Sequence, residues 1–158
     1  MKKSISICLL LLAILTLGGC NQEDDINEIF VSGVWNLNDY YSNADWNSNN
    51  DKNARPKYAH LIDDKKIINR FTIEFKEDGT LSGVMENKVS FTGKWSANPD
   101  DRSISITQLK PASSALKGRN QEFIRSLETA RFYKGNSQWI QLAPEARTTY
   151  VQLTHIQP

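Results

Sequence analysis

Apolar and polar residues alternate along much of the second half of the chain, and this period of two predicts β-strands. Phe71, Ile73 and Phe75 alternate with charged and hydroxylated residues, so one face of the segment is apolar. Glu-Asp-Gly-Thr at 77–80 is typical of a hairpin turn, because Gly79 adopts a positive φ without a steric penalty. A returning strand is expected at 81–85, and apolar and polar residues alternate again at 89–95 and 104–107. We therefore predict an antiparallel meander with one apolar face.

The period changes once, over residues 121–129. Its apolar residues form one stripe of an amphipathic helix, namely Phe123, Ile124 and Leu127 with Ala130 next, and Asn120 is a candidate N-cap. Strands are expected again at 130–133, 138–142 and 148–156. The predicted fold class is mainly β (β-rich α+β), a compact antiparallel sheet or barrel-like meander with one packed helix near 121–129.

The region before the meander is more polar. A first strand is expected near residues 34–37, and residues 36–53 contain seven Asn, followed by Pro56. Asn side chains compete for backbone hydrogen bonds, so we expect a long Asn-rich loop over 36–56. The expected organisation is a signal peptide at 1–19, a tether at 20–30 and a single β domain at 31–158.

The first twenty residues are predicted to direct export. Lys2 and Lys3 precede an apolar run at 5–17, which is too short to span a bilayer, since about 20 apolar residues are needed. Leu17-Gly18-Gly19-Cys20 resembles the lipobox of bacterial lipoproteins. The resemblance implies cleavage before Cys20 and acylation of Cys20, with palmitate among the acyl groups. These acyl chains anchor the protein in a membrane. The acidic residues 23–25 resemble the export signal of Bacteroidetes lipoproteins, which implies the outer membrane with possible exposure at the cell surface.

Composition then limits the partners. Of the 158 residues, 139 remain after residue 19, with 17 basic and 18 acidic residues and Cys20 as the only cysteine. A near-neutral domain lacks the excess basic charge of a nucleic-acid binder, so we expect no nucleic acid as partner. With its one thiol acylated, the domain has no disulfide and depends on its core for stability.

Several segments together resemble the META domain, the HslJ-type domain of bacterial envelope lipoproteins. The matching segments, in chain order, are 33–37, 71–75, 78–83, 91–95, 103–107, 122–127, 133–136 and 139–142. The resemblance implies a β-structure with a packed helix, no established catalytic residues and an association with envelope stress. The alternative is a lipocalin-like barrel, because Gly33-Val34-Trp35 contains the Gly-x-Trp that such proteins carry on a first strand.

Candidate catalytic or metal-binding groups are few. His60 lies near Asp63 and Asp64, but a tetrahedral site needs further nitrogen or sulfur ligands, so we interpret these as solvated loop charges. His155 alternates with apolar residues and is expected to be packed or at a rim. Residues 45–51 place oxygen ligands at every second position, as a calcium loop does, but lack its Gly and its final Glu. We therefore expect no metal, no cofactor and no catalysis.

The candidates for ligand or partner contact are aromatic residues in the N-terminal third. Trp46 lies inside the polar loop, and Tyr40 and Tyr41 precede it. The alternative for Trp46 is a side chain folded back over the core. Our first hypothesis is a non-catalytic outer-membrane or surface lipoprotein that binds an unknown protein, glycan or small molecule, or has a structural role. Alternatives are a lipocalin-like small-molecule binder, favoured by a pocket at one barrel end, and a hydrolase of envelope polymers.

Overall fold

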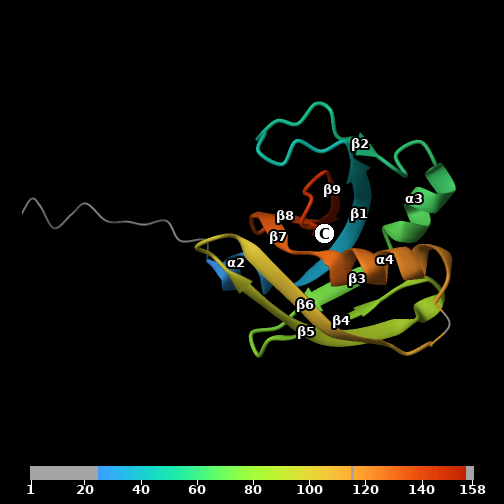
Figure 1. Ribbon diagram of the computed structural model, residues 1–158. Coiled ribbons are helices and arrows are strands. Elements are labelled where there is room, and N and C mark those ends of the chain that lie inside the picture. Colours follow the sequence, from blue (N-terminus) through green and yellow to red (C-terminus); the bar gives the residue numbers. More distant parts are fainter. Residues whose placement is uncertain (1–24, 115, 156–158) are drawn as a thin grey trace, which may run out of the picture.

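The strands join in one antiparallel sheet that closes into a ring, so the mainly β prediction is confirmed (Figure 1). The computed structural model describes residues 25–114 and 116–155. Its elements in chain order are α2 (Ile26–Phe30), β1 (Val34–Ser42), β2 (Arg55–Pro56), α3 (Ile62–Ile68), β3 (Thr72–Phe75), β4 (Thr80–Val84), the 3-10 turn η1 (Glu86–Lys88), β5 (Ser90–Asn98), β6 (Ser103–Pro111), α4 (Gly118–Thr129), β7 (Phe132–Gly135), β8 (Trp139–Ala143) and β9 (Thr149–Thr154).

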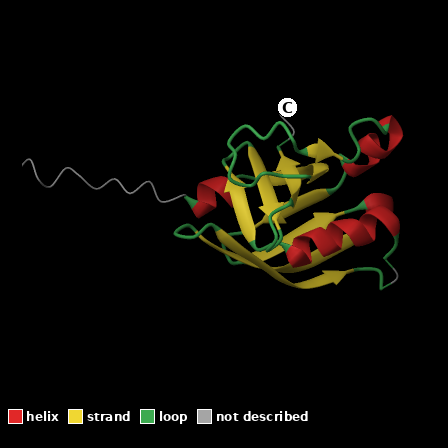
Figure 2. Cartoon of the chain, turned by 45° about the horizontal axis from the view of Figure 1, so that its top comes forward, coloured by secondary structure: helices red, strands yellow, loops and turns green. Residues whose placement is uncertain are grey.

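Strand β1 closes the ring because it pairs on both sides. The order along the sheet is β2-β1-β3-β4-β5-β6-β7-β8-β9, and β9 also pairs with β1, from Asn36↔Thr154 to Ser42↔Thr149. On its other side, β1 pairs first with β3 and then, towards its end, with β2. The pairing between β6 and β7 is the shortest in the ring, with the single register pair Ser103↔Phe132. The long helix α4 connects these two strands and packs against β6 and β8 (Figure 2).

Aromatic side chains fill the interior of the ring. The largest fully buried ones are Trp35, Tyr133, Phe30, Phe71, Phe75, Phe91 and Phe123. The Phe123 ring of α4 meets Phe71 and Phe91 edge to face, with centroids 5.5 and 5.9 Å apart. Such pairs add about 0.5–1.5 kcal/mol each beyond the burial of apolar area. Helix α4 is therefore part of the core.

Gly83 in β4 makes room for this aromatic packing. A Cβ atom at this position would lie 2.4 Å from the Phe91 ring and 2.2 Å from the Thr72 carbonyl oxygen. Only glycine lets the Phe91 ring cross the strand here.

The prediction of a tether over residues 20–30 is wrong for its last part. Residues 26–30 form α2, and the side chain of Asp25 caps it by accepting hydrogen bonds from the Asn27 and Glu28 amides, both at 3.0 Å. Phe30 is fully buried and contacts Phe75 and Tyr133. A helix of one turn is too short to show a period in the sequence. The predicted signal peptide 1–19 and Cys20 lie outside the described residues.

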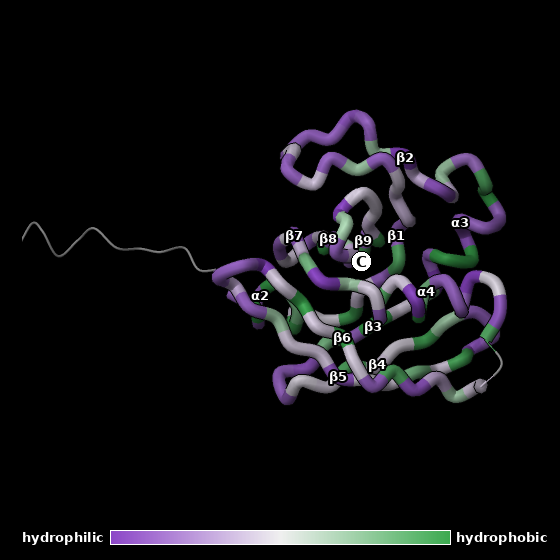
Figure 3. Tube along the Cα trace, in the orientation of Figure 1, coloured by the Kyte–Doolittle hydropathy of each residue, from purple (hydrophilic) through white to green (hydrophobic). Residues whose placement is uncertain are grey.

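The prediction of a loop over 36–56 is also wrong at its start, because β1 continues to Ser42. Its polar side chains find partners in the fold: the Asn36 amide donates to the Asn69 carbonyl at 3.1 Å. The loop proper covers residues 43–54, between β1 and β2, and is hydrophilic along most of its length (Figure 3).

Two features of the helices also differ from expectation. Residues 62–68 form α3, where a loop was predicted, and α4 begins at Gly118 with Lys117 as its N-cap, so the N-cap prediction for Asn120 is wrong. Asn120 is buried instead and holds the backbone of Glu86. Within the described residues, no helix is both long enough and apolar enough to cross a membrane.

Candidate functional site

A cleft of about 1110 Å³ opens at one end of the ring, between α4 and the ends of β1, β2, β8 and β9. Its base is formed by the inward-facing pair Tyr40 and Val151, which are register partners, and by Leu142, the next partner of Val151. Below them the interior is filled by the aromatic core. The cleft is thus the mouth of a barrel whose inside is packed.

Four tyrosines line this cleft. Tyr40 and Tyr58 meet edge to face with centroids 6.0 Å apart, and Tyr41 and Tyr150 stack across β1 and β9 at 4.7 Å. Burial raises the pKa of Tyr40, and the Glu122 charge adds to the effect. Burial also raises the pKa of Tyr150, to about 12. At neutral pH the tyrosines are therefore uncharged rings with a polar tip.

Asp39 holds the back wall of the cleft together. Its side chain is 1% exposed and accepts hydrogen bonds from the Tyr40 amide at 2.8 Å and the Tyr58 amide at 3.0 Å. The ammonium of Lys65, on α3, lies 3.2 Å from the other carboxylate oxygen and also donates to the Asn38 carbonyl. One carboxylate thus ties β1 to the segment after β2 and to α3.

Glu122 of α4 joins the two walls. Its carboxylate accepts a hydrogen bond from the Tyr58 hydroxyl at 2.9 Å and pairs with Lys57 at 2.5 Å. The Lys57 ammonium also lies 5.0 Å from the centroid of the Tyr58 ring. Both atoms of the Glu122 carboxylate are therefore already engaged.

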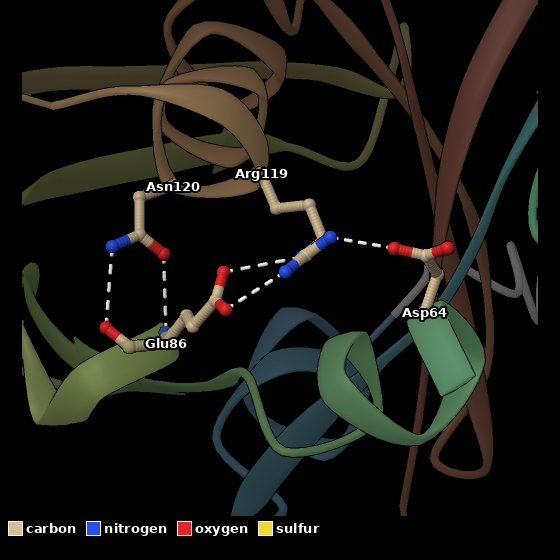
Figure 4. A network of polar contacts seen from close by, with 4 residues as sticks. All are labelled: Asp64, Glu86, Arg119 and Asn120. Atoms are coloured by element: carbon tan, nitrogen blue, oxygen red, sulfur yellow. Dashed lines mark hydrogen bonds and ion pairs between the residues drawn. The ribbon is translucent and has the colours of Figure 1, made fainter.

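A second ionic network fixes the start of α4 (Figure 4). Arg119 binds Glu86 through two nitrogens, at 3.1 and 2.8 Å, and its third nitrogen reaches Asp64 of α3 at 2.5 Å. The Asn120 side chain accepts a hydrogen bond from the Glu86 backbone amide at 3.1 Å and donates one to the Glu86 carbonyl at 3.2 Å. The network joins α3, η1 and α4 at the rim of the cleft. The interpretation of Asp64 as a solvated loop charge is therefore wrong.

Three basic residues of the cleft have no such partner. Arg55, Lys117 and Arg125 line it, and none of the hydrogen bonds or ion pairs within 25–114 and 116–155 involves their side chains. The two carboxylates that line the cleft, Glu86 and Glu122, are already paired with Arg119 and Lys57. The cleft therefore carries a surplus of three positive charges at neutral pH.

The Tyr40 hydroxyl is another unpaired group. Its oxygen is inaccessible to solvent and has no hydrogen-bond partner within the part of the chain that the structure describes. A buried hydroxyl without a partner costs about 1–3 kcal/mol. The Ser126 side chain on α4 is near enough to lower the pKa of Tyr40 against the effect of burial, so Tyr40 joins β1 to α4 mainly by packing, and Tyr58 supplies the hydrogen bond to α4.

The structure separates the three aromatic candidates. Tyr40 and Tyr41 lie in the cleft, whereas Trp46 lies on the outside of the ring in a hollow of about 420 Å³ with Lys134, Trp139 and Tyr150. Trp46 is half-buried: the Lys134 ammonium lies 4.8 Å from its ring centroid and donates to its carbonyl oxygen. The Trp46 side chain therefore packs on the outer face of the sheet and not over the core, as the alternative had it.

The two histidines and Asp63 lie outside the cleft. His155 stacks on Trp35 at 3.8 Å, and its ring nitrogens lie 2.8 Å from the Val34 carbonyl and the Ser32 hydroxyl, as expected of a packed histidine. His60 and Asp63 are exposed. Within the described ranges, no three acidic, histidine or cysteine side chains are close enough together to hold a metal ion.

The carboxylates of the suspected calcium loop hold the loop's own backbone. Asp51 accepts hydrogen bonds from the Asp45, Asn53 and Ala54 amides, and Asp45 accepts from Asn47. The alternating polar residues are thus explained by turns in which a side chain replaces a backbone acceptor.

Sequence reasoning missed most of the cleft. The missed residues come from three segments far apart in the chain, and no local pattern connects them: Arg55 with Tyr58, Lys117 with Arg125, and Tyr150. The aromatic residues between 35 and 58 were the one available signal, and it pointed to Tyr40 and Tyr41.

Comparison with known proteins identifies relatives. The family model "Domain of unknown function (DUF4847)" matches residues 21–155. A crystal structure at 1.00 Å resolution of a DUF4847 family protein from Bacteroides vulgatus ATCC 8482 is 34% identical, with a TM-score of 0.70, over 84% of this chain and 99% of that chain. An NMR structure of a protein from Burkholderia xenovorans is 14% identical, with a TM-score of 0.49, over 80% and 83% of the two chains. No curated protein matches this chain.

These matches overturn the resemblance to the META domain, which is wrong. The segments that carried it are ones that a barrel of this kind needs for local reasons: Asp78-Gly79 forms a tight turn, and Gly83 makes room for Phe91. Both are general requirements of tight turns and of close packing in a sheet, so they do not identify a family. The family model covers most of the chain and the identity to the Bacteroides vulgatus protein extends over nearly all of that protein. The chain therefore belongs to the DUF4847 family.

Proposed function

We propose that this protein is a non-catalytic, lipid-anchored binding protein of the bacterial outer membrane, and that the cleft at the barrel mouth holds its ligand. The observation that carries the proposal is the cleft itself, lined by four tyrosines and by cations without partners. Ligand sites are typically concave, mainly apolar and equipped with a few oriented polar groups.

The position of the cleft relative to α2 supports this arrangement. Strand β1 begins beside α2, where the Trp35 indole donates to the Phe30 carbonyl at 3.0 Å, and it ends at the cleft with Tyr41. Tyr41 lies six positions after Trp35 along the strand, which amounts to about 20 Å. A lipid on Cys20 is attached through α2, so the cleft faces away from the anchored end.

A binding role fits the cleft better than catalysis. Among the described residues that line the cleft there is no His, Cys or Asp, and both glutamates are paired with cations. A general base needs a free lone pair within reach of a substrate proton. The hydroxyl of Ser126 donates to the Phe123 carbonyl at 2.7 Å and has no base beside it to activate it.

Two experiments test the proposal. Cys20→Ala is expected to move the protein from the membrane to the soluble fraction, and a variant that stays with the membrane would exclude the lipid anchor. Protease treatment of intact cells then checks display, since digestion only after lysis would place the protein inside the envelope.

The cleft is tested by filling it. Thr129→Trp introduces a large side chain on the cleft wall of α4, and Glu128→Trp, one residue away and outside this cleft, is the matched control. In a thermal-shift screen of small molecules, ligands of the cleft stabilise the wild type and the control but not Thr129→Trp. If Thr129→Trp responds to every ligand as the control does, the cleft is not the binding site.

A further inference from the structure

The carboxylates of the cleft have ion-pair partners within the protein, whereas three of its cations have none in the part of the chain that the structure describes. Its acidic side chains are neutralised within the protein, while Arg55, Lys117 and Arg125 have no acidic partner among the described residues. Arg55 belongs to β2 and Arg125 to α4, two elements that lie apart in Figure 1. Both residues line the cleft, so its cations come from different elements. Unpaired guanidinium groups present planar pairs of donors that match carboxylate and phosphate oxygens.

The base of the cleft has the opposite character. Leu142 and Val151 are buried beneath it, and the apolar surface that a ligand meets comes from the partly buried rings of Tyr40, Tyr41 and Tyr150. Burial keeps Tyr40 and Tyr150 uncharged. A ligand that satisfies both parts has an apolar or ring-shaped body and more than one acidic group at its edge. The volume, about 1110 Å³, is slightly above the range for small-molecule sites, roughly 300–1,000 Å³, so a small molecule would fill only part of the cleft.

From this distribution we infer that the cleft binds a small organic polyanion, a ring-bearing or branched di- or tricarboxylate or phosphate. The inference rests on the proposed function, because it names the class of ligand for the same cleft. A long polyanionic polymer is disfavoured, since it draws its affinity from many cations along its length. Here the domain from residue 20 onward has 17 basic and 18 acidic residues and so no overall positive excess, whereas the lining of the cleft has three more basic than acidic side chains.

The test uses benzene-1,3,5-tricarboxylate as the probe and the neutral 1,3,5-tricarboxamide as its matched control, titrated calorimetrically into the full mature protein. The tricarboxylate is expected to bind, and Arg55→Gln/Arg125→Gln to weaken it by at least about tenfold for each guanidinium removed. Arg70→Gln/Lys110→Gln removes the same charge from exposed positions outside the cleft and is expected to bind within about twofold of the wild type.

The outcomes separate this inference from the proposed function. The inference of an anionic ligand would be overturned if the triamide and the tricarboxylate bound equally well. If Thr129→Trp blocked both, the cleft would remain the binding site. Binding of heparin but not of the tricarboxylate, lost in the Arg55→Gln/Arg125→Gln variant, would overturn it in favour of a polymer. Equal weakening by the two charge-neutralising pairs would overturn it as well, because only the net charge would then matter.

Discussion

Replacing Asp39 is expected to be among the most destabilising single changes near the cleft. The carboxylate is 1% exposed and joins three segments through the Tyr40 amide, the Tyr58 amide and the Lys65 ammonium. Asp39→Ala leaves two amide donors without their acceptor, in a place that water reaches poorly, while the Lys65 ammonium keeps its bonds to Asn38. The loss therefore includes the cost of unsatisfied groups as well as the bonds themselves.

The magnitude follows from these partners. Each hydrogen bond to a charged acceptor contributes about 1.5–3 kcal/mol, and breaking a buried pair costs about 3–5 kcal/mol. The Lys65 side chain is 26% exposed and regains water, so its share lies at the low end. We expect Asp39→Ala to lower the free energy of unfolding by about 3–5 kcal/mol. Asp39→Asn retains an acceptor oxygen and is expected to cost about half as much.

Urea denaturation followed by tryptophan fluorescence measures the effect, with the slope checked for two-state behaviour. Asp63→Asn is the matched control, because that side chain is 97% exposed on the same helix as Lys65, and its midpoint is expected to stay unchanged. A cycle of Asp39→Asn and Lys65→Met is expected to give a coupling of at least about 1 kcal/mol. A loss below about 1 kcal/mol for Asp39→Ala would refute the role assigned to this carboxylate.

Two further predictions concern the tyrosines of the cleft. Tyr40→Phe removes a buried hydroxyl without a partner and is expected to leave the free energy of unfolding unchanged or to raise it by up to about 1 kcal/mol. Tyr58→Phe removes the hydrogen bond to Glu122 and is expected to lower the free energy of unfolding by about 1–2 kcal/mol. Equal effects of the two variants in thermal unfolding would contradict this difference between the two hydroxyls. The pKa of Tyr150 is raised to about 12 in the folded protein, so its stabilisation is complete below pH 10 and is lost as the pH rises from 10 to 12. Tyr150→Phe should make unfolding less steeply dependent on pH in that window, and an unchanged slope in urea titrations at pH 9–12 would contradict it.

The parts of the fold that sequence patterns predicted are those fixed by neighbouring residues. Phe71, Ile73 and Phe75 alternate because successive side chains of a strand point to opposite faces, and all three are buried in the ring. The helix at 121–129 was recognisable from its stripe, although the structure begins it at Gly118. Helices α2 and α3 escaped prediction because each is too short for a periodic stripe to stand out.

The cleft could not be predicted in the same way. Its central contact joins Lys57 and Tyr58 to Glu122, which lie 65 and 64 positions apart, and the stacked pair Tyr41 and Tyr150 depends on β1 meeting β9. Asn-rich composition also misled at residues 36–42, where partners elsewhere in the fold satisfy the polar side chains of β1. Propensity describes a residue's local alternatives, and tertiary partners override it.

The sequence by itself therefore determined the class of fold, the strand and helix faces of the meander, and the expectation that Cys20 carries a lipid. Each of these depends on spacing within a few residues. The tertiary structure decided that the strands close into a ring, that the aromatic core fills it, and that Arg55, Lys117 and Arg125 gather without acidic partners at its mouth. Those features arise from contacts between distant segments, whose energies depend on geometry in three dimensions and leave no periodic trace along the chain.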